Sequence, residues 1–524
     1  MLLDNNSNQI KKTKLLSGQS LTSIPPMASA ISKRIARFRQ DYIKQVDAAK
    51  TFFCEYQEQL NTRAKFKKSI QAYQDQIDLI ENYRKEKGKY PKIKDQPSTE
   101  RYLTRLYRLQ DNAKKESREF ERKLIALQSE RYQRLDHLVD QILDLLDGQK
   151  IFSQFLGTIA LSVPSPEEKV RHVRNEKNKP IFITALAIAL FEEVRTKLDA
   201  SNIHPYLTKK MGQIFHDSHQ YNLMIDKSEE NDKQHIMPLE VKIAYREEIL
   251  KPLAKACLLQ SIGSHSPEVD ELFGRDRYRM LSQDERAELL RLNFEKTTDF
   301  IKIGIGIPAT RFDTREERAE FIQQEAEKIQ FILDIQKRLS QTQDNLGDLL
   351  RIPMVYTSII LSTKPEFDYN QIYTAYDTLA QGAENNVYHP DYTQVFNQMV
   401  GRFPLGSGIY FIQQETGQIE KSIVSSLYPQ SPNEPICKQI TRRQLIFLSQ
   451  TEVVISQSSN LYFDTSRSFS HYSDSYFQTK FANGYVWNAS ELWEVQIPAV
   501  NFWKKDGTIK YNGQYEPHDD EYDI

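Results

Sequence analysis

The chain has 524 residues, with 70 Lys and Arg against 71 Asp and Glu and a formal net charge of −1. This length allows about three domains at the usual 100–200 residues per domain, and the balanced charge excludes a uniformly basic nucleic-acid binder. Only 18 residues are glycine, and no GxxxxGK[ST] or GxGxxG segment is present, which excludes the common nucleotide-binding loops.

The even balance of charge is the sum of two opposite parts. Residues 1–150 hold 30 Lys and Arg against 20 Asp and Glu, a net of +10 that leaves −11 for the remainder, and the sequence ends in the acidic segment EPHDDEYDI. The longest mainly apolar run, Pro180–Phe191, has 12 residues, whereas a membrane helix needs about 20. We therefore expect no membrane span. The three cysteines lie far apart in the sequence, which indicates buried thiols in a reducing, cytoplasmic compartment.

The first part of the chain reads as a polar leader followed by a helical hairpin. Residues 1–27 are polar and end in a Pro-Pro pair, so we expect a disordered leader. Apolar residues then recur every three or four positions in two long runs, with Gly88, Pro91 and Pro97 between them. This pattern predicts an antiparallel helical hairpin or coiled coil over residues 28–148.

The second part, residues 150–403, predicts an all-helical domain. Pro180–Phe191 is apolar on nearly every side, which indicates a helix buried in a globular core. Ser282 followed by Glu285 is a capping box, so a helix begins near Gln283. Thr314–Leu339 predicts a further helix whose outer face is rich in Glu and Lys.

The last part changes to a β pattern. After Pro404 the sequence consists of short alternating or β-branched runs separated by turns, with Glu415-Thr416-Gly417 between the first two runs. We expect a small β-rich module over residues 404–460. Residues 461–524 give mixed signals, so we treat them as a C-terminal extension with an acidic tail. The predicted fold class is mainly α, with a long hairpin, an all-helical domain and a small β-rich module.

Histidine and arginine clusters are the candidate sites. His216, Asp217 and His219 form the one tight cluster among the ten histidines. His and Asp are metal ligands, so this cluster is a candidate metal site; a polar helix end with solvated histidines is the alternative. Arg275, Arg277 and Arg279 place three guanidinium groups within five residues. They are candidate contacts for a phosphate or nucleotide, and a structural ion-pair network with Asp276 and Glu285 is the alternative.

A series of short segments between about 250 and 430 follows the order of landmarks of a known family. These segments are Lys255–Gly263 (KACLLQSIG), Leu281–Arg286, Arg351-Ile352, the tyrosine-rich Tyr369–Leu379, His389-Pro390-Asp391 and Gly401–Ser407 (GRFPLGS). Together they resemble the HD-GYP branch of the HD-domain phosphohydrolases, whose first landmark reads Ala-Ala-Leu-Leu-His-Asp-Ile-Gly. The resemblance covers about a third of the chain. It implies a helical domain that in the family hydrolyses cyclic di-GMP at a multi-metal site.

The chain departs from the family at the catalytic motifs. The paired His-Asp of the family is Gln260-Ser261 here, and neither side chain supplies an anionic or imidazole ligand. The interval from Phe300 to Arg351, where the family has further histidines, contains none. Gln260 and Ser261 are therefore degenerate motif positions, and the resemblance implies a fold without its chemistry.

These observations predict a catalytically inactive HD-GYP-like regulatory or scaffolding protein, with no catalytic residue and no cofactor, and with cyclic di-GMP as a candidate ligand that it does not hydrolyse. A divergent phosphohydrolase with Fe, Mn or Zn on His216, Asp217 and His219 is one alternative. The other is a structural protein whose hairpin, residues 28–148, binds a protein partner or a second copy. The hairpin carries no DNA-recognition module, so we expect no DNA partner.

Overall fold

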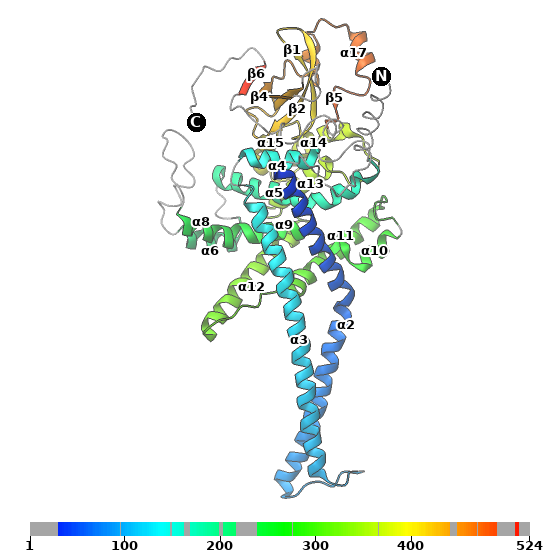
Figure 1. The fold of residues 1–524 in the computed structure, drawn as a ribbon, viewed down its shortest axis with the longest axis vertical. Coiled ribbons are helices and arrows are strands. Elements are labelled where there is room, and N and C mark those ends of the chain that lie inside the picture. The colour runs from blue at the N-terminus through cyan, green and yellow to red at the C-terminus, as the bar shows by residue number, and fades with distance from the viewer. Residues whose placement is uncertain are drawn as a thin grey trace, which may run out of the picture.

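The computed structural model describes residues 30–94, 96–146, 149–161, 168–198, 203–215, 238–274, 276–364, 366–440, 448–468, 470–489 and 509–512. These residues form a helical hairpin, a helical body and a β-sheet along one long axis, with the hairpin and the sheet at opposite ends (Figure 1). The mainly helical fold class is confirmed. The predicted leader, residues 1–27, lies outside the described residues.

The hairpin, which we call the arm, consists of α2 (Ala30–Lys87) and α3 (Thr99–Leu143). At 1.5 Å per residue α2 is ~87 Å long. The predicted break is present: Gly88 adopts a positive φ of 68°, and the Ser98 side chain caps α3. Far from the body the two helices meet along a narrow apolar seam whose buried members are Ile77, Ile80, Leu103 and Leu106.

The base of the arm is packed into the body. Phe52 of α2 is 1% exposed, and its ring lies 5.5 Å from the ring of Phe300. From α3, the Arg131 guanidinium donates to the Gly304 carbonyl at 3.1 Å. Aromatic burial and a buried charged hydrogen bond thus hold the arm to the body at one end, and the other end projects freely (Figure 1).

The body consists of short helices around one large core. Its α-helices are α4 (Gln149–Leu161), α5 (Glu168–Lys197), α6 (Pro205–Ile214), α8 (Leu239–Tyr245), α9 (Lys251–Leu259), α10 (Pro267–Phe273), α11 (Gln283–Asp299), α12 (Arg315–Arg338), α13 (Asp348–Ile360), α14 (Ala375–Glu384) and α15 (Pro390–Val400). Two π-helical turns, η2 (Arg246–Leu250) and η4 (Phe300–Ile305), and two 3₁₀ turns, η3 (Ile262–His265) and η5 (Tyr369–Thr374), complete it. None of the described helices combines the length and apolarity that crossing a membrane requires.

The body helices begin and are buried as the sequence predicts. Pro180–Phe191 lies within α5, and ten of its twelve residues are apolar side chains at most 7% exposed. The capping box of Ser282 and Glu285 starts α11 at Gln283, and a second one at Thr314 and Glu317 starts α12. In these places local sequence and tertiary packing specify the same element.

The sheet has six strands in the order β5-β1-β2-β3-β4-β6. They are β1 (Gly408–Gln413), β2 (Gln418–Ser426), β3 (Ile436–Ile440), β4 (Leu448–Ile455), β5 (Val486–Trp487) and β6 (Ile509–Asn512). Two short helices, α16 (Asp464–Arg467) and α17 (Asp474–Lys480), lie between β4 and β5. The predicted β1–β2 hairpin turns at Gly417, where φ is 62°.

The predicted boundary of the β-rich module, residues 404–460, is too short. β5 and β6 come from the region that we treated as a mixed extension, and β6 pairs in parallel with β4. The reason is physical: runs of two and four residues are too short to show a period-of-two pattern.

Candidate functional site

A cleft of about 810 Å³ opens at the C-terminal end of α9. Gln260, which follows the last residue of α9, and Ser261 both line it, together with residues of α5, α11 and the end of α12. The two positions that the resemblance aligns with the family's His-Asp pair therefore lie together in the wall of a cleft. The volume lies within the range of ligand pockets, roughly 300–1,000 Å³.

The end of α9 is held tightly against α11. The Gly263 amide donates to Thr297 Oγ1 at 3.0 Å, and Asn293 donates to the Gln260 carbonyl at 2.8 Å. A Cβ on residue 263 would lie 2.3 Å from the Asn293 carbonyl oxygen, so only glycine allows this approach. The Ile-Gly that ends the family-like segment thus has a packing role in this chain.

A polar cluster closes one side of the cleft. Arg277 pairs with Glu176 at 2.9 Å and with Asp270 at 3.0 Å, and the Tyr278 hydroxyl donates to Glu176 at 2.7 Å. Burial opposes ionisation of Glu176, but the hydrogen bonds from Tyr278 and Arg277 outweigh it and lower the pKa of this carboxyl. Burial, with Arg277 beside it, lowers the pKa of His265 to about 3, so this imidazole is neutral.

Lys179 of α5 lines the cleft, and no ion pair among the described residues includes its ammonium. Its side chain is partly buried, and burial lowers its pKa to about 8, with Glu176 opposing the shift. No ion pair or hydrogen bond joins the Lys179 ammonium to any residue that the structure describes. A partly buried ammonium without a direct ion pair is costly, and an anion bound in the cleft would lower that cost.

The opposite wall of the cleft is apolar and accessible. Leu290 is 69% exposed and Phe294 43% exposed, although both belong to a helix that packs on the body. Leu289, Leu339 and Met354 line the same cleft. An aromatic or aliphatic ligand surface would be shielded from water here, so the cleft pairs the Lys179 ammonium with an apolar wall.

The donor set of the cleft does not fit a divalent metal. Among the residues that line it, the one carboxylate, Glu176, already accepts from Arg277 and Tyr278, and the ammonium and guanidinium groups repel a cation. Among the described residues, no group of three or more His, Cys, Asp or Glu could hold a metal ion. The candidate metal residues His216, Asp217 and His219 lie outside the described residues.

The arginine segment does not act as one anion grip in its described part. Arg275 lies outside the described residues, and Arg277 holds Glu176 in the cleft. Arg279 instead makes a two-point ion pair with Glu285, at 2.6 and 3.1 Å, and its guanidinium also donates to backbone carbonyls. Arg277 and Arg279 therefore hold separate structural partners.

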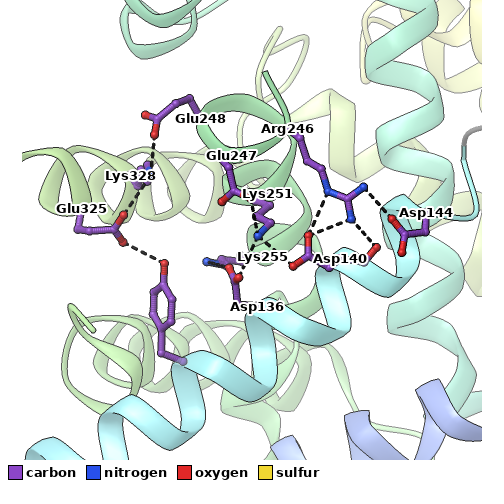
Figure 2. Close-up of polar contacts among 11 residues, drawn as sticks. Asp136, Asp140, Asp144, Arg246, Glu247, Glu248, Lys251, Lys255, Glu325 and Lys328 are labelled. Carbon is purple, nitrogen blue, oxygen red and sulfur yellow. Dashed lines mark hydrogen bonds and ion pairs between the residues drawn. The ribbon is translucent and has the colours of Figure 1, made fainter. Parts of the chain in front are cut away.

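A second cavity, of about 450 Å³, lies where the arm joins the body. Seven charged residues of α3, η2, α9 and α12 line it. Together with Asp140, Asp144 and Arg246 beside the cavity, they form what we call the junction network (Figure 2). Its members are Asp136, Asp140, Asp144, Arg246, Glu247, Glu248, Lys251, Lys255, Glu325 and Lys328.

Each cation of the junction network has at least one carboxylate partner. Lys251 pairs with Asp136, Asp140 and Glu247 at 2.7–3.0 Å, and Lys255 pairs with Asp136 at 2.6 Å. Burial lowers the pKa of Lys255. Burial opposes the ionisation of Asp136, but the two lysines outweigh it and lower its pKa. The network therefore fastens arm to body, and its cations are already occupied by carboxylates of the chain.

The sequence contained weak signals for the groups that make the cleft. Lys179 stands directly before the apolar run Pro180–Phe191, so periodicity places it at the edge of a buried helix without revealing its electrostatic surroundings. Phe294 falls within a charged amphipathic helix, α11, where a single aromatic residue gives no sequence signal for a binding surface. The role of these two residues becomes apparent only in the fold, where α5 and α11 line the same cleft.

Comparison with known proteins finds no matching family model, curated protein or solved structure for this chain. The function proposed below therefore rests on the residues of the cleft.

Proposed function

We propose that the chain is a catalytically inactive, HD-GYP-like regulatory protein whose cleft binds an amphipathic organic anion, with a nucleotide such as cyclic di-GMP as the candidate ligand. The observation that carries the proposal is Lys179, a partly buried ammonium that makes no direct ion pair among the described residues, opposite an exposed apolar wall. A phosphate or carboxylate would pair with Lys179, and a base or ring would cover Leu290 and Phe294.

Hydrolysis is not expected from Gln260, Ser261 or His265. Cleaving a phosphodiester requires an activated water, which a metal ion or a strong general base supplies. The Gln260 amide and Ser261 hydroxyl do neither at neutral pH. With a pKa of about 3, His265 is too weak a base and cannot act as a general acid near neutrality.

A regulatory role fits the position of the cleft. Gln260 directly follows α9, the helix that carries Lys251 and Lys255 of the junction network. A ligand that contacts one end of this helix adjoins the element that holds the arm. Binding that favours one position of α9 would therefore bias the attachment of the arm.

The test is calorimetry on the full chain with cyclic di-GMP, GTP and ATP as probes, and guanosine as the uncharged comparison. We expect at least one nucleotide to bind, guanosine to bind at least tenfold more weakly, and Lys179→Met to weaken nucleotide binding at least tenfold. Lys177→Met removes an equal charge two residues earlier on the same helix, from a position that does not line the cleft, and should leave affinity unchanged. Failure of all three nucleotides to bind would overturn the proposal.

The phosphohydrolase alternative has its own readout. Stoichiometric Fe, Mn or Zn in the purified protein, together with metal-dependent cleavage of cyclic di-GMP that His216→Ala abolishes, would replace the proposal with an enzyme. We expect intact cyclic di-GMP after incubation with each metal, measured by chromatography.

A further inference from the structure

The outward face of α3 carries a straight row of cations. The buried seam residues Leu103, Leu106 and Gln110 define the side of α3 that faces α2. Positions halfway around the helix from that seam recur every seven residues and face away from α2. All four such positions in the projecting part are basic, namely Arg101, Arg108, Lys115 and Arg122, and we call them the basic stripe.

The basic stripe is exposed, and its cations are unpaired within the part of the chain that the structure describes. All four side chains are exposed, and no ion pair among the described residues includes any of them. The positions three and four residues on from the stripe flank it on the same face, where Arg105 and Arg118 add cations and Asp111 and Glu119 are the acidic members. The face therefore carries six cations against two carboxylates.

The stripe is specific to α3. The matching outward positions of α2 are Asn61, Lys68, Asp75 and Asn82, which sum to no net charge. Charges seven residues apart on a helix are ~10.5 Å from each other, so a row of like charges gives the arm no stability. The cations of the junction network, by contrast, are paired with carboxylates. The stripe therefore reads as a surface for an anionic partner.

We propose that the basic stripe binds the acidic segment 516–523 (EPHDDEYD) of a second copy of this chain. The segment carries five carboxylates in eight residues, at Glu516, Asp519, Asp520, Glu521 and Asp523. Extended, it spans ~24 Å, close to the ~21 Å that separate Arg108 from Arg122 on α3. Length and charge of the two elements therefore match.

The segment has to come from another copy because of distance. The described chain ends at Asn512 of β6, and 11 further residues reach at most ~40 Å. Along α3 alone, Arg108 is ~53 Å from Leu143, and the sheet lies at the opposite end of the molecule from the projecting arm (Figure 1). A segment of the same chain cannot reach Arg108 or Arg101.

Two copies related by a two-fold axis, with their long axes antiparallel, can exchange these contacts reciprocally. Each copy offers one stripe and one acidic segment, so a two-fold pair satisfies both and closes the assembly. The contact is electrostatic and exposed, so it weakens as the screening length falls from ~10 Å at 0.1 M salt to ~3 Å at 1 M. This inference is independent of the ligand of the cleft.

The test is sedimentation velocity of the full chain over a concentration series at 0.05 M and 0.5 M NaCl. We expect a dimer at low salt that dissociates at high salt, and a dimer dissociation constant at least tenfold higher for the stripe variant R101Q/R108Q/K115Q. Gln keeps the helix propensity of Arg and Lys, so the arm should fold as before.

Two further variants make the assignment specific. The α2 variant K65Q/K67Q/K68Q removes the same charge from exposed positions of the other arm helix and should dimerise like the parent. A chain carrying R101E/R108E/K115E, mixed with a chain carrying D519K/D520K/E521K, should associate, although neither chain dimerises alone.

A monomer at low salt, equal loss in the α2 variant, or no rescue by charge exchange would each overturn the proposal. So would a stripe variant that dimerises normally but no longer binds a single-stranded RNA or an anionic vesicle, because the stripe would then serve that other partner.

Discussion

Replacing Asp136 with Asn is expected to loosen α9 from the arm. Among the described residues, Asp136 is the carboxylate that pairs with Lys255, whose side chain is 9% exposed, whereas Lys251 keeps Asp140 and Glu247. The substitution keeps the size of the side chain and leaves the Lys255 ammonium buried without its ion pair. Removing one partner of a buried pair costs about 3–5 kcal/mol. We expect the lower end, because the Lys255 ammonium also lies 4.1 Å from the centre of the Tyr132 ring.

The assay is hydrogen exchange of the α9 amides, since a chain of this size does not unfold in one step. A loss of about 3 kcal/mol corresponds to roughly 100-fold faster exchange. The double variant Asp136→Asn with Lys255→Met removes the orphaned charge and should recover at least half of the loss in free energy. Lys209→Gln, which breaks the exposed pair with Glu327, should leave α9 exchange unchanged. An Asp136→Asn variant that exchanges less than about fivefold faster, or a double variant no better than the single one, would refute the reasoning.

Two further predictions concern the cleft. Because the pKa of Lys179 is about 8, its ammonium is charged below this pH and neutral above it. Nucleotide affinity measured by calorimetry should therefore fall about 10- to 30-fold between pH 7 and pH 9.5, and a flat profile would exclude Lys179 as the anion contact. Gly263→Ala should speed hydrogen exchange of the α9 amides through a loss of about 1–3 kcal/mol in local stability, because the new Cβ meets the Asn293 carbonyl and the Thr297 amide. Gly212→Ala, on an open helical face, is the control that should be neutral or stabilising; equal effects of the two would contradict the packing role of Gly263.

Elements specified by near neighbours were predictable from the sequence. The capping box at Ser282 and Glu285, the hairpin break at Gly88 and the turn at Gly417 each depend on residues within four positions of one another, and each is present. The hairpin and the buried helix of α5 followed from apolar periodicity for the same reason.

The cleft and the junction network depend on contacts between residues far apart in the sequence. The periodicity of apolar residues does not predict such contacts. Lys255 lies within a segment that reads as amphipathic, and its partner Asp136 is 119 positions earlier; Arg277 meets Glu176 across 101 residues. The pairing of β4 with β6 likewise joins segments that are far apart in the sequence, and no local sequence signal predicts it. The degenerate motif positions Gln260 and Ser261 were placed by resemblance, and the HD-GYP-like family remains a hypothesis for this chain.

The π-helical turn η2 sets which side of α9 meets the arm. At this turn the Lys251 amide donates to the Arg246 carbonyl, five residues back, so the helix accommodates one residue more than an α-helix would. Deleting one residue from η2 would restore α-helical winding and rotate everything before it by about 100° relative to α9. Either Arg246 and Glu247 would then turn away from the arm while Lys251 and Lys255 still faced it, or Lys251 and Lys255 would turn away while Arg246 and Glu247 still faced it. The one extra residue of η2 therefore sets which residues of this helix face the arm. A one-residue deletion there would weaken the attachment of the arm to the body more than the loss of any one ion pair.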